Sequence, residues 1–285
     1  MSETDDILSM RLRSHIKQVA LERDIYFNRL THFSVREYVR DQLAMHGDVH
    51  SHQFEVRGEL FENLVLDIPG HDGGCSSPVL IGAHYDGVVG SPGADDNASG
   101  VAVLLELGRS LTADPPPYPI RLVAFDLEEM GLLGSRAYAT HLKGQGEHLR
   151  LMLSLEMLGY CDSTPGSQRY PFGLSVWYPK QGDFIALVGD VLSIRDMRRL
   201  GHAFRQTGTP CEWLAAGLRG MIVPATRRSD HASFWDAGYR AMMVTDTAFL
   251  RNPNYHTAGD RPDTLDVEFL AHVYVGLEKG VRSLR

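Results

Sequence analysis

The sequence has few cysteines and no long apolar segment. Its three cysteines, Cys75, Cys161 and Cys211, are too far apart for zinc-knuckle spacing or a disulfide framework. We therefore expect free thiols in a reducing compartment. No basic N-terminal stretch precedes an apolar one, which favours a cytoplasmic location. The longest apolar run, residues 100–108, is far shorter than the ~20 residues of a membrane-spanning helix, so we expect no membrane partner.

The chain also lacks an excess of basic residues. Its 285 residues include 28 Lys and Arg against 36 Asp and Glu, a formal net charge of −8. Because nucleic-acid-binding proteins normally carry a basic patch, we expect no nucleic-acid partner. The motifs HExxH, GxSxG, GxxxxGK[ST] and GxGxxG are absent, and the cysteines lack the local signatures of cysteine proteases. Nucleotide-binding and serine- or cysteine-hydrolase functions therefore have no support, and the oligomeric state is not predictable.

Strand-like and helix-like hydrophobic patterns alternate along the chain. Two amphipathic helices are predicted within residues 7–46, and short strands within 52–69. Further strands are predicted at 79–86, 119–129, 149–159, 184–189 and 241–250, and helices at about 101–111, 131–142, 194–206 and 265–284. Asn97 or Ser99 is expected to cap the helix at 101–111. This alternation predicts an α/β fold of three layers, α/β/α, around a central mixed, mostly parallel sheet.

We predict a single domain over residues 1–285, because no internal repeat or linker interrupts the pattern. The segment at about 160–228 is less regular, and we expect it to cover the cleft and to supply much of the specificity pocket. Aromatic candidates for that pocket are Tyr160, Trp177, Trp213 and Phe249.

Ionisable side chains gather at or just beyond the ends of the predicted strands. They are His84, Asp86, Asp95, Asp96, Glu128, Glu129, Glu156 and His256. Functional residues of such sheets lie at the carboxyl ends of the strands, and imidazoles with carboxylates can hold zinc without a thiolate. Glu128 and Glu129 point in different directions, so one can bind a metal while the other accepts a proton from an activated water. Asp86 is suited to orient the His84 ring, and Asp95 to support the site or to cap the next helix.

Six segments around these residues resemble the motifs of the di-zinc aminopeptidase family, which includes the bacterial leucyl aminopeptidases and to which the glutaminyl cyclases are related. They read GAHYD, GSPGADDNASG, VAFDLEEMGLLGS, SLEMLGY, RRSDHASFWDAGY and NYHTAGD, in the order of the family. They cover the chain from about His84 to His256. The resemblance implies a zinc-exopeptidase fold of the phosphorylase/hydrolase-like type.

The same resemblance implies two zinc ions per chain, bridged by Asp96 and a water or hydroxide. His84 and Glu156 would bind one ion, and Glu129 and His256 the other. Many members have Asp where this chain has Glu156, whose side chain is one methylene longer.

The resemblance also assigns roles in catalysis. Glu128 would be the general base and later the general acid, and Tyr255 would donate a hydrogen bond to the oxyanion. Arg228 and His231 lie in a segment that resembles the family's sequence near the substrate's amino end. We therefore predict a zinc-dependent aminopeptidase acting on peptides. The alternatives are a single-zinc acyltransferase resembling glutaminyl cyclases, a carboxypeptidase, or a non-catalytic binding domain, which the intact glutamate pair disfavours.

Overall fold

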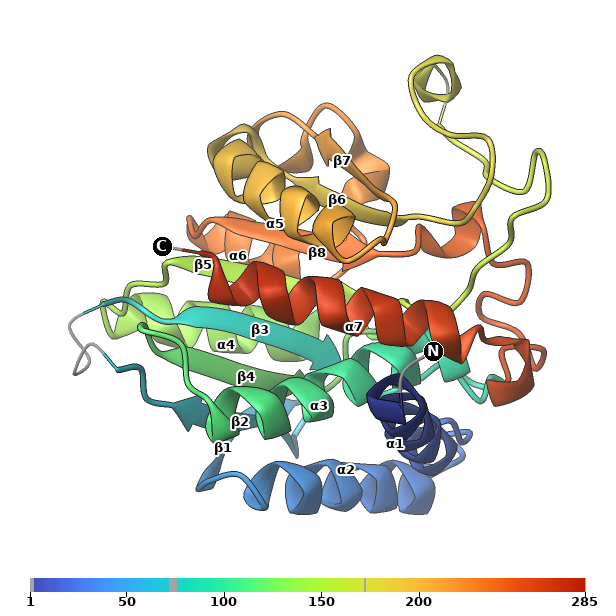
Figure 1. The fold of residues 1–285 in the computed structure, drawn as a ribbon. Helices are drawn as coiled ribbons and strands as arrows, with labels where there is room; N and C mark the ends of the chain where they lie inside the picture. Colours follow the sequence, from blue (N-terminus) through green and yellow to red (C-terminus); the bar gives the residue numbers. More distant parts are fainter. Residues whose placement is uncertain (1–2, 72–75, 172, 285) are drawn as a thin grey trace.

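One mixed β-sheet runs through the molecule (Figure 1). The computed structural model describes residues 3–71, 76–171 and 173–284. In these residues the strands are β1 (Val49–Val56), β2 (Glu59–Ile68), β3 (Val79–His84), β4 (Ile120–Phe125), β5 (Leu151–Glu156), β6 (Ile185–Gly189), β7 (Cys211–Ala215) and β8 (Ala241–Thr245). Their order in the sheet is β1-β2-β4-β3-β5-β8-β6-β7. The central strands β4, β3, β5 and β8 are parallel, and β1, β2 and the β6–β8 pairing are antiparallel.

Helices cover both faces of the sheet and confirm the predicted three layers. They are α1 (Glu3–Val19), α2 (Arg29–Ala44), α3 (Gly100–Ala113), α4 (Leu133–Gly144), α5 (Ile194–Gln206), α6 (His231–Ala237) and α7 (Val267–Arg282). In Figure 1, α3 and α7 lie in front of the sheet, and α4 and α6 lie behind it. The central strands β3 and β5 are buried along their whole length, as expected for parallel strands covered on both faces. Each face has its own apolar core.

Several strands end earlier than the hydrophobic pattern predicts. The strand predicted at 119–129 ends at Phe125, and the one predicted at 241–250 ends at Thr245. The chain turns at these points, so the acidic residues that follow leave the sheet and reach the site. Asp126–Glu129 therefore form a turn between β4 and α4 rather than the end of a strand.

The segment 160–228 contains the predicted strand and helix, as β6 and α5, and one strand that was not predicted, β7. The short helix α6 directly after it was not predicted either. The predicted caps of α3 are wrong, because neither side chain bonds the first turn of that helix. Instead the Asn97 amide donates to Leu155 O and accepts from Met157 N, while the Ser99 hydroxyl donates to Asp95 O. These residues connect the start of α3 to the end of β5.

Two of the three cysteines are described, and Cys161 and Cys211 are free thiols. Cys75 lies outside the described residues. None of the helices in the described part of the chain combines the length and the apolar character needed to cross a membrane.

Candidate metal centre

The ionisable side chains predicted as metal ligands converge at the carboxyl ends of the central strands. His84 is the last residue of β3, and Glu156 is the last residue of β5, its parallel neighbour. Asp96 lies in the turn that leads into α3, Glu129 in the turn after β4, and His256 in the segment between β8 and α7. Parallel strands bring their carboxyl ends to one edge, so residues 172 positions apart in the chain become neighbours.

Two triads of side chains share the carboxylate of Asp96. Asp96 Oδ1 lies 3.2 Å from His84 Nε2, and Glu156 Oε2 lies 3.7 Å from the same nitrogen. Asp96 Oδ2 lies 3.0 Å from His256 Nε2, which is 3.2 Å from Glu129 Oε2. In each triad the candidate ligand atoms lie within 4.8 Å of one another. A carboxylate placed between two such groups is suited to bridge two cations.

The donor set fits zinc. His84 Nε2, His256 Nε2, Glu129 Oε1 and Glu156 Oε2 are buried, and none makes a well-formed hydrogen bond in the described chain, although Asp96 lies close to both imidazole nitrogens. Buried polar atoms without partners are costly, so their convergence indicates a ligand that satisfies them together. Imidazole nitrogen and carboxylate oxygen, without thiolate, are typical ligands of catalytic zinc. The fifth predicted ligand, Asp96, is 5% exposed and lies between the two triads.

The pKa values of the ligands reflect this crowding of charges. Burial alone would lower the pKa of His256, but the carboxylates of Asp96 and Glu129 raise it to about 10. Burial, followed by the charge of Asp96, raises the pKa of Glu129 to about 7. The carboxylates thus repel one another and hold the imidazole as a cation. Divalent cations would take over this compensation, because they favour deprotonated ligands.

Glu128 is buried but belongs to neither triad. Burial raises its pKa well above the ordinary value; the imidazole of His84 opposes this shift, and Glu156 and Glu129 reinforce it. A carboxyl group whose pKa is shifted toward neutrality can both accept and return a proton. Glu128 is thus a buried carboxyl group next to the predicted ligands but outside both triads.

Asp86 holds the turn that carries both glutamates. Its Oδ1 accepts a hydrogen bond from Glu128 N and its Oδ2 one from Glu129 N, each at 3.1 Å. Asp86 Oδ1 also lies 3.3 Å from His84 Nδ1, the ring nitrogen that faces away from Asp96. One carboxylate thus lies against the imidazole of His84 and also holds the backbone of Glu128 and Glu129.

Three further residues hold the Asp96 turn, and of these only Asp95 was predicted to support the site. Asp260 accepts from Asp95 N and Asp96 N at 2.9 and 3.0 Å. The buried Arg23, between α1 and α2, donates to the carbonyls of Gly93 and Asp96, and also to Pro92 O. Asp95 accepts from Gly159 N and from the amide of Asn252, so it supports the site and caps no helix. Asp260 stood in a motif of the sequence, whereas nothing near Arg23 pointed to the site.

Tyr255 lies directly against the second triad. Its ring stacks on His256, with centroids 3.8 Å apart. Burial raises the pKa of its phenol, so the hydroxyl remains a hydrogen-bond donor at neutral pH. The exposed Arg228 lies nearby, with its guanidinium carbon 4.7 Å from the ring centroid of Phe249 and 6.0 Å from that of Tyr255.

The fold does not provide the substrate contact expected of His231. The residue is fully buried, its Nε2 bonds Thr226 O at 2.8 Å, and its ring packs edge-on against Trp235. Burial lowers its pKa to about 3, so the imidazole is neutral. His231 therefore shapes the interior behind the site. Its neighbour Asp230 is equally buried, and both of its carboxylate oxygens lack a partner in the described chain.

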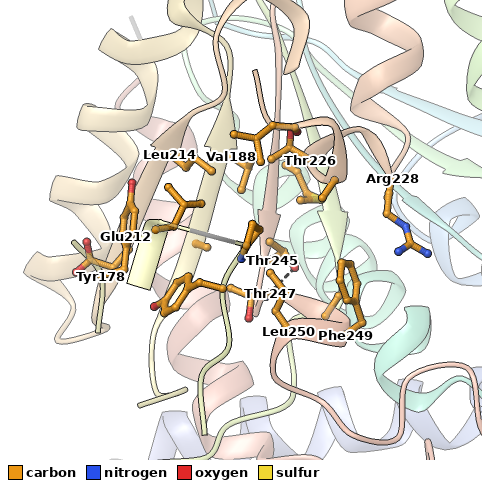
Figure 2. A pocket seen from close by; sticks show the side chains of 18 of the residues that line it. Tyr178, Val188, Glu212, Leu214, Thr226, Arg228, Thr245, Thr247, Phe249 and Leu250 are labelled. Carbon is orange, nitrogen blue, oxygen red and sulfur yellow. Dashed lines mark hydrogen bonds between the residues drawn. The ribbon is translucent and has the colours of Figure 1, made fainter. Parts of the chain in front are cut away.

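A mostly apolar pocket opens beside the two triads (Figure 2). Glu156 and Tyr255 belong to its wall, as do Arg228 and Phe249. Of the predicted aromatic candidates, Trp213 and Phe249 line it, whereas Trp177 is 82% exposed. The site therefore consists of a cluster of candidate metal ligands beside a mostly apolar pocket.

Two His–carboxylate triads at the carboxyl ends of parallel strands are an arrangement suited to a metal-dependent hydrolase. The sequence model of peptidase family M28 matches residues 63–278, and the chain belongs to that family. The predicted resemblance and enzyme class, a zinc metallopeptidase, are thereby confirmed.

Relatives by sequence support the same grouping. The uncharacterized protein YfbL of Escherichia coli is 38% identical over 253 residues, covering 85% of this chain and 77% of YfbL. A probable leucine aminopeptidase of Arthroderma otae is 30% identical over 242 residues, covering 77% of this chain and 57% of its own length. The chain thus spans little more than half of that leucine aminopeptidase.

Solved structures share the fold. The Legionella pneumophila LapA aminopeptidase superposes with a TM-score of 0.74 at 20% identity, covering 97% of this chain and 72% of LapA. BSAP, a zinc aminopeptidase from Bacillus subtilis, has a TM-score of 0.60 at 26% identity, covering 79% of this chain and 50% of BSAP. A glutaminyl cyclase of Bacteroides thetaiotaomicron has a TM-score of 0.68 at 16% identity, covering 98% of this chain and 97% of the cyclase. The fold alone therefore does not separate peptidases from cyclases.

Proposed function

We propose that the chain is a zinc-dependent aminopeptidase that holds two ions and removes single residues from the N-termini of peptides. The observation that carries this proposal is the position of Asp96, whose two oxygens lie 3.2 and 3.0 Å from imidazole nitrogens of separate triads. A site that needed one metal would need only one such triad. The names of the leucine aminopeptidase and of BSAP add support.

The five ligands divide as the distances suggest. His84 and Glu156 would hold one ion, Glu129 and His256 the other, and Asp96 would contact both. When bound, the ions would supply Lewis-acid polarisation of the scissile carbonyl and acidify the attacking water.

The remaining steps fall to residues of the chain. Glu128 accepts the proton of the attacking water and returns it to the leaving amine, for which its raised pKa suits it. Tyr255 donates its hydroxyl proton to the oxyanion that develops on the carbonyl. Asp86 keeps Glu128 in place through the backbone N–H. The side chain of the residue being removed enters the pocket that begins at Glu156 and Tyr255.

The test combines metal content with a panel of substrates. We expect two zinc ions per chain and hydrolysis of aminoacyl amides with a free amine, but not of their N-acetyl forms. Glu128→Gln should keep both ions and lose about a hundredfold or more in kcat, the usual contribution of a positioned base. Glu55→Gln, an exposed residue of β1, is the matched control and should retain full activity.

Other results would redirect the assignment. A single ion together with cyclisation of N-terminal glutamine would indicate the acyltransferase alternative. Release of C-terminal residues from N-acetylated peptides would indicate a carboxypeptidase. Metal binding without turnover of any of these substrates would indicate a binding domain.

A further inference from the structure

The far end of the pocket carries a carboxylate. The pocket floor is made by β8, β6 and β7, and its walls include the aromatic side chains of Tyr170 and Tyr178. Figure 2 shows Glu212 beside Tyr178 at one end of this pocket and Phe249 with Arg228 at the other. Glu212 and Arg228 therefore lie at opposite ends of a mostly apolar cavity.

The sheet register fixes how far this carboxylate lies from the metal centre. Glu156 pairs with Thr245, Thr245 with Ala186, and Ala186 with Glu212. These four residues form one cross-strand row whose side chains point to the same face. With ~4.8 Å between strands, the Cα atoms of Glu156 and Glu212 lie roughly 14 Å apart. The two residues between them are small, so the floor of the pocket stays open.

The described chain offers Glu212 no partner of its own. No ion pair or side-chain hydrogen bond joins its carboxylate to another described residue. The hydroxyls of the neighbouring tyrosines are directed elsewhere, Tyr170 to Pro179 O and Tyr178 to Trp213 O. Arg205 donates to Cys211 O, the preceding residue of β7. Burial raises the pKa of Glu212, and only Arg205 opposes this shift.

Glu212 is only partly buried, so a cation in the pocket would replace water at a carboxylate that lies beside apolar groups. A leucine-sized side chain would stop short of Glu212 and leave it facing apolar groups. An extended lysine side chain spans about 6 Å from Cα to Nζ. A charge-assisted hydrogen bond adds about 2.8 Å. Of the ~14 Å between Glu156 and Glu212, ~5 Å then remains beside Glu156 for the amide that reacts.

We infer that the pocket selects an N-terminal residue with a long side chain and a cationic tip, lysine or arginine, and that Glu212 pairs with that cation. The aliphatic stem lies over Ala186 and Thr245, between the aromatic walls. Arg228 lies beside Phe249, at the end of the pocket opposite Glu212 (Figure 2). This inference rests on the aminopeptidase function proposed above and names its substrate class.

The experiment compares side chains of equal length that differ in charge. The zinc-loaded protein is assayed with the p-nitroanilides of lysine, arginine, norleucine and leucine. We expect kcat/KM for lysine to exceed that for norleucine by about tenfold or more, the usual effect of a hydrogen bond to a charged group. Glu212→Gln should reduce this lysine-to-norleucine ratio by about tenfold, mainly through KM.

Two further variants sharpen the result. Glu268→Gln removes a carboxylate exposed on α7, outside the site, and should keep the wild-type ratio. Glu212→Arg should invert the preference, so that glutamate p-nitroanilide is cleaved faster than the lysine compound. Calorimetry with lysinamide and norleucinamide on the zinc-loaded Glu128→Gln protein gives a readout independent of turnover, with lysinamide binding about tenfold more tightly.

The failures of the two proposals differ. Hydrolysis of leucine or norleucine anilide with no preference for lysine, or a ratio that Glu212→Gln leaves unchanged, overturns the role of Glu212 while the aminopeptidase stands. Absence of hydrolysis of any free-amine substrate, with lysinamide still preferred in calorimetry, overturns the aminopeptidase and leaves the pocket assignment. A variant that unfolds is recognised by its circular dichroism, and the wild-type ratio then decides.

Discussion

The two ends of the site are built in different ways. At the metal end, the carboxylate of Asp86 holds the turn directly after β4, and that of Asp260 holds the turn that leads into α3, each by accepting backbone N–H groups. At the pocket end, the walls come from the long segment between β5 and β6 and from loops after β7 and β8. The first arrangement depends on the identity of a few residues next to strands, and the second on the path of long connections. Reaction chemistry and substrate selection therefore have separate structural supports in this molecule.

The largest effect should come from breaking the metal end at its shared ligand. Asp96→Asn removes one of the two anionic oxygens placed between the triads, so we expect zinc content to fall from two ions to one or none. Activity should fall by about a thousandfold or more, because metal activation of the water and of the carbonyl is lost together. Zinc analysis and kcat/KM measure both.

The same variant gives a stability test. A chelator should lower the melting temperature of the wild type, because bound ions stabilise only the folded state. At a free zinc concentration about a thousand times Kd, this stabilisation is about 4 kcal/mol. The melting temperature of Asp96→Asn should change much less with chelator. Asp48→Asn, on an exposed turn, is the control and should behave as the wild type. If a chelator lowered the melting temperature of Asp96→Asn as much as that of Asp48→Asn, the role of Asp96 as a ligand shared by both ions would be contradicted.

A smaller effect is expected from the residue that holds the metal loop from outside. Arg23→Met leaves the carbonyls of Pro92, Gly93 and Asp96 without their buried donor. We expect a loss of about 3 kcal/mol in the free energy of unfolding, since each unsatisfied group costs on the order of 1–3 kcal/mol. Zinc affinity should fall about tenfold, as for other residues that support metal ligands. Urea titration and zinc competition provide the measurements.

Arg13→Met is the matched control for that variant, because Arg13 is exposed on α1 and should change neither quantity. Unaltered zinc affinity in Arg23→Met, with stability reduced, would show that the loop keeps its geometry without the guanidinium. The geometry of the metal end would then depend less on side chains that bond the backbone of the Asp96 turn than we infer above.

The smallest effect should come from the outer part of the pocket segment. Trp177 is 82% exposed and does not line the pocket, so Trp177→Ala should change kcat/KM less than about twofold and stability by less than about 0.5 kcal/mol. Tyr178→Ala, which removes a wall beside Glu212, provides the contrast and should raise KM. A large effect of Trp177→Ala would show that this segment closes over bound substrate.

The difference between the two ends also explains what the sequence could reveal. His84, Asp96, Glu129, Glu156 and His256 were recognisable because each follows a predicted strand or lies in a family-like motif, and the structure brings them together. Arg23 was not, since a lone arginine between two helices carries no local signal. Its role depends on packing across about 70 residues of chain. Glu212 lies in a strand hidden within an irregular stretch, and only sheet register shows that it shares a row with Glu156.

The wrong predictions also arise because packing between distant segments cannot be read from local sequence. Asn97 and Ser99 were assigned to helix capping from local preference, but contacts with β5 use their side chains instead. His231 has a suitable side chain in a suggestive motif, yet the packing of α6 buries it completely. Local rules predict what a residue can do, whereas the surrounding packing determines which partner it meets.

The position of Asp86 limits how this enzyme can be retuned. Because one carboxylate holds the backbone of both the proposed base, Glu128, and a proposed metal ligand, Glu129, we expect no substitution at Asp86 to change proton transfer alone. Across a set of replacements at this position, turnover and zinc affinity should fall in proportion on a logarithmic plot. The pocket has no such shared anchor. Substitutions in the cross-strand row that ends at Glu212 can therefore change the substrate preference of related sequences without changing the reaction that they catalyse.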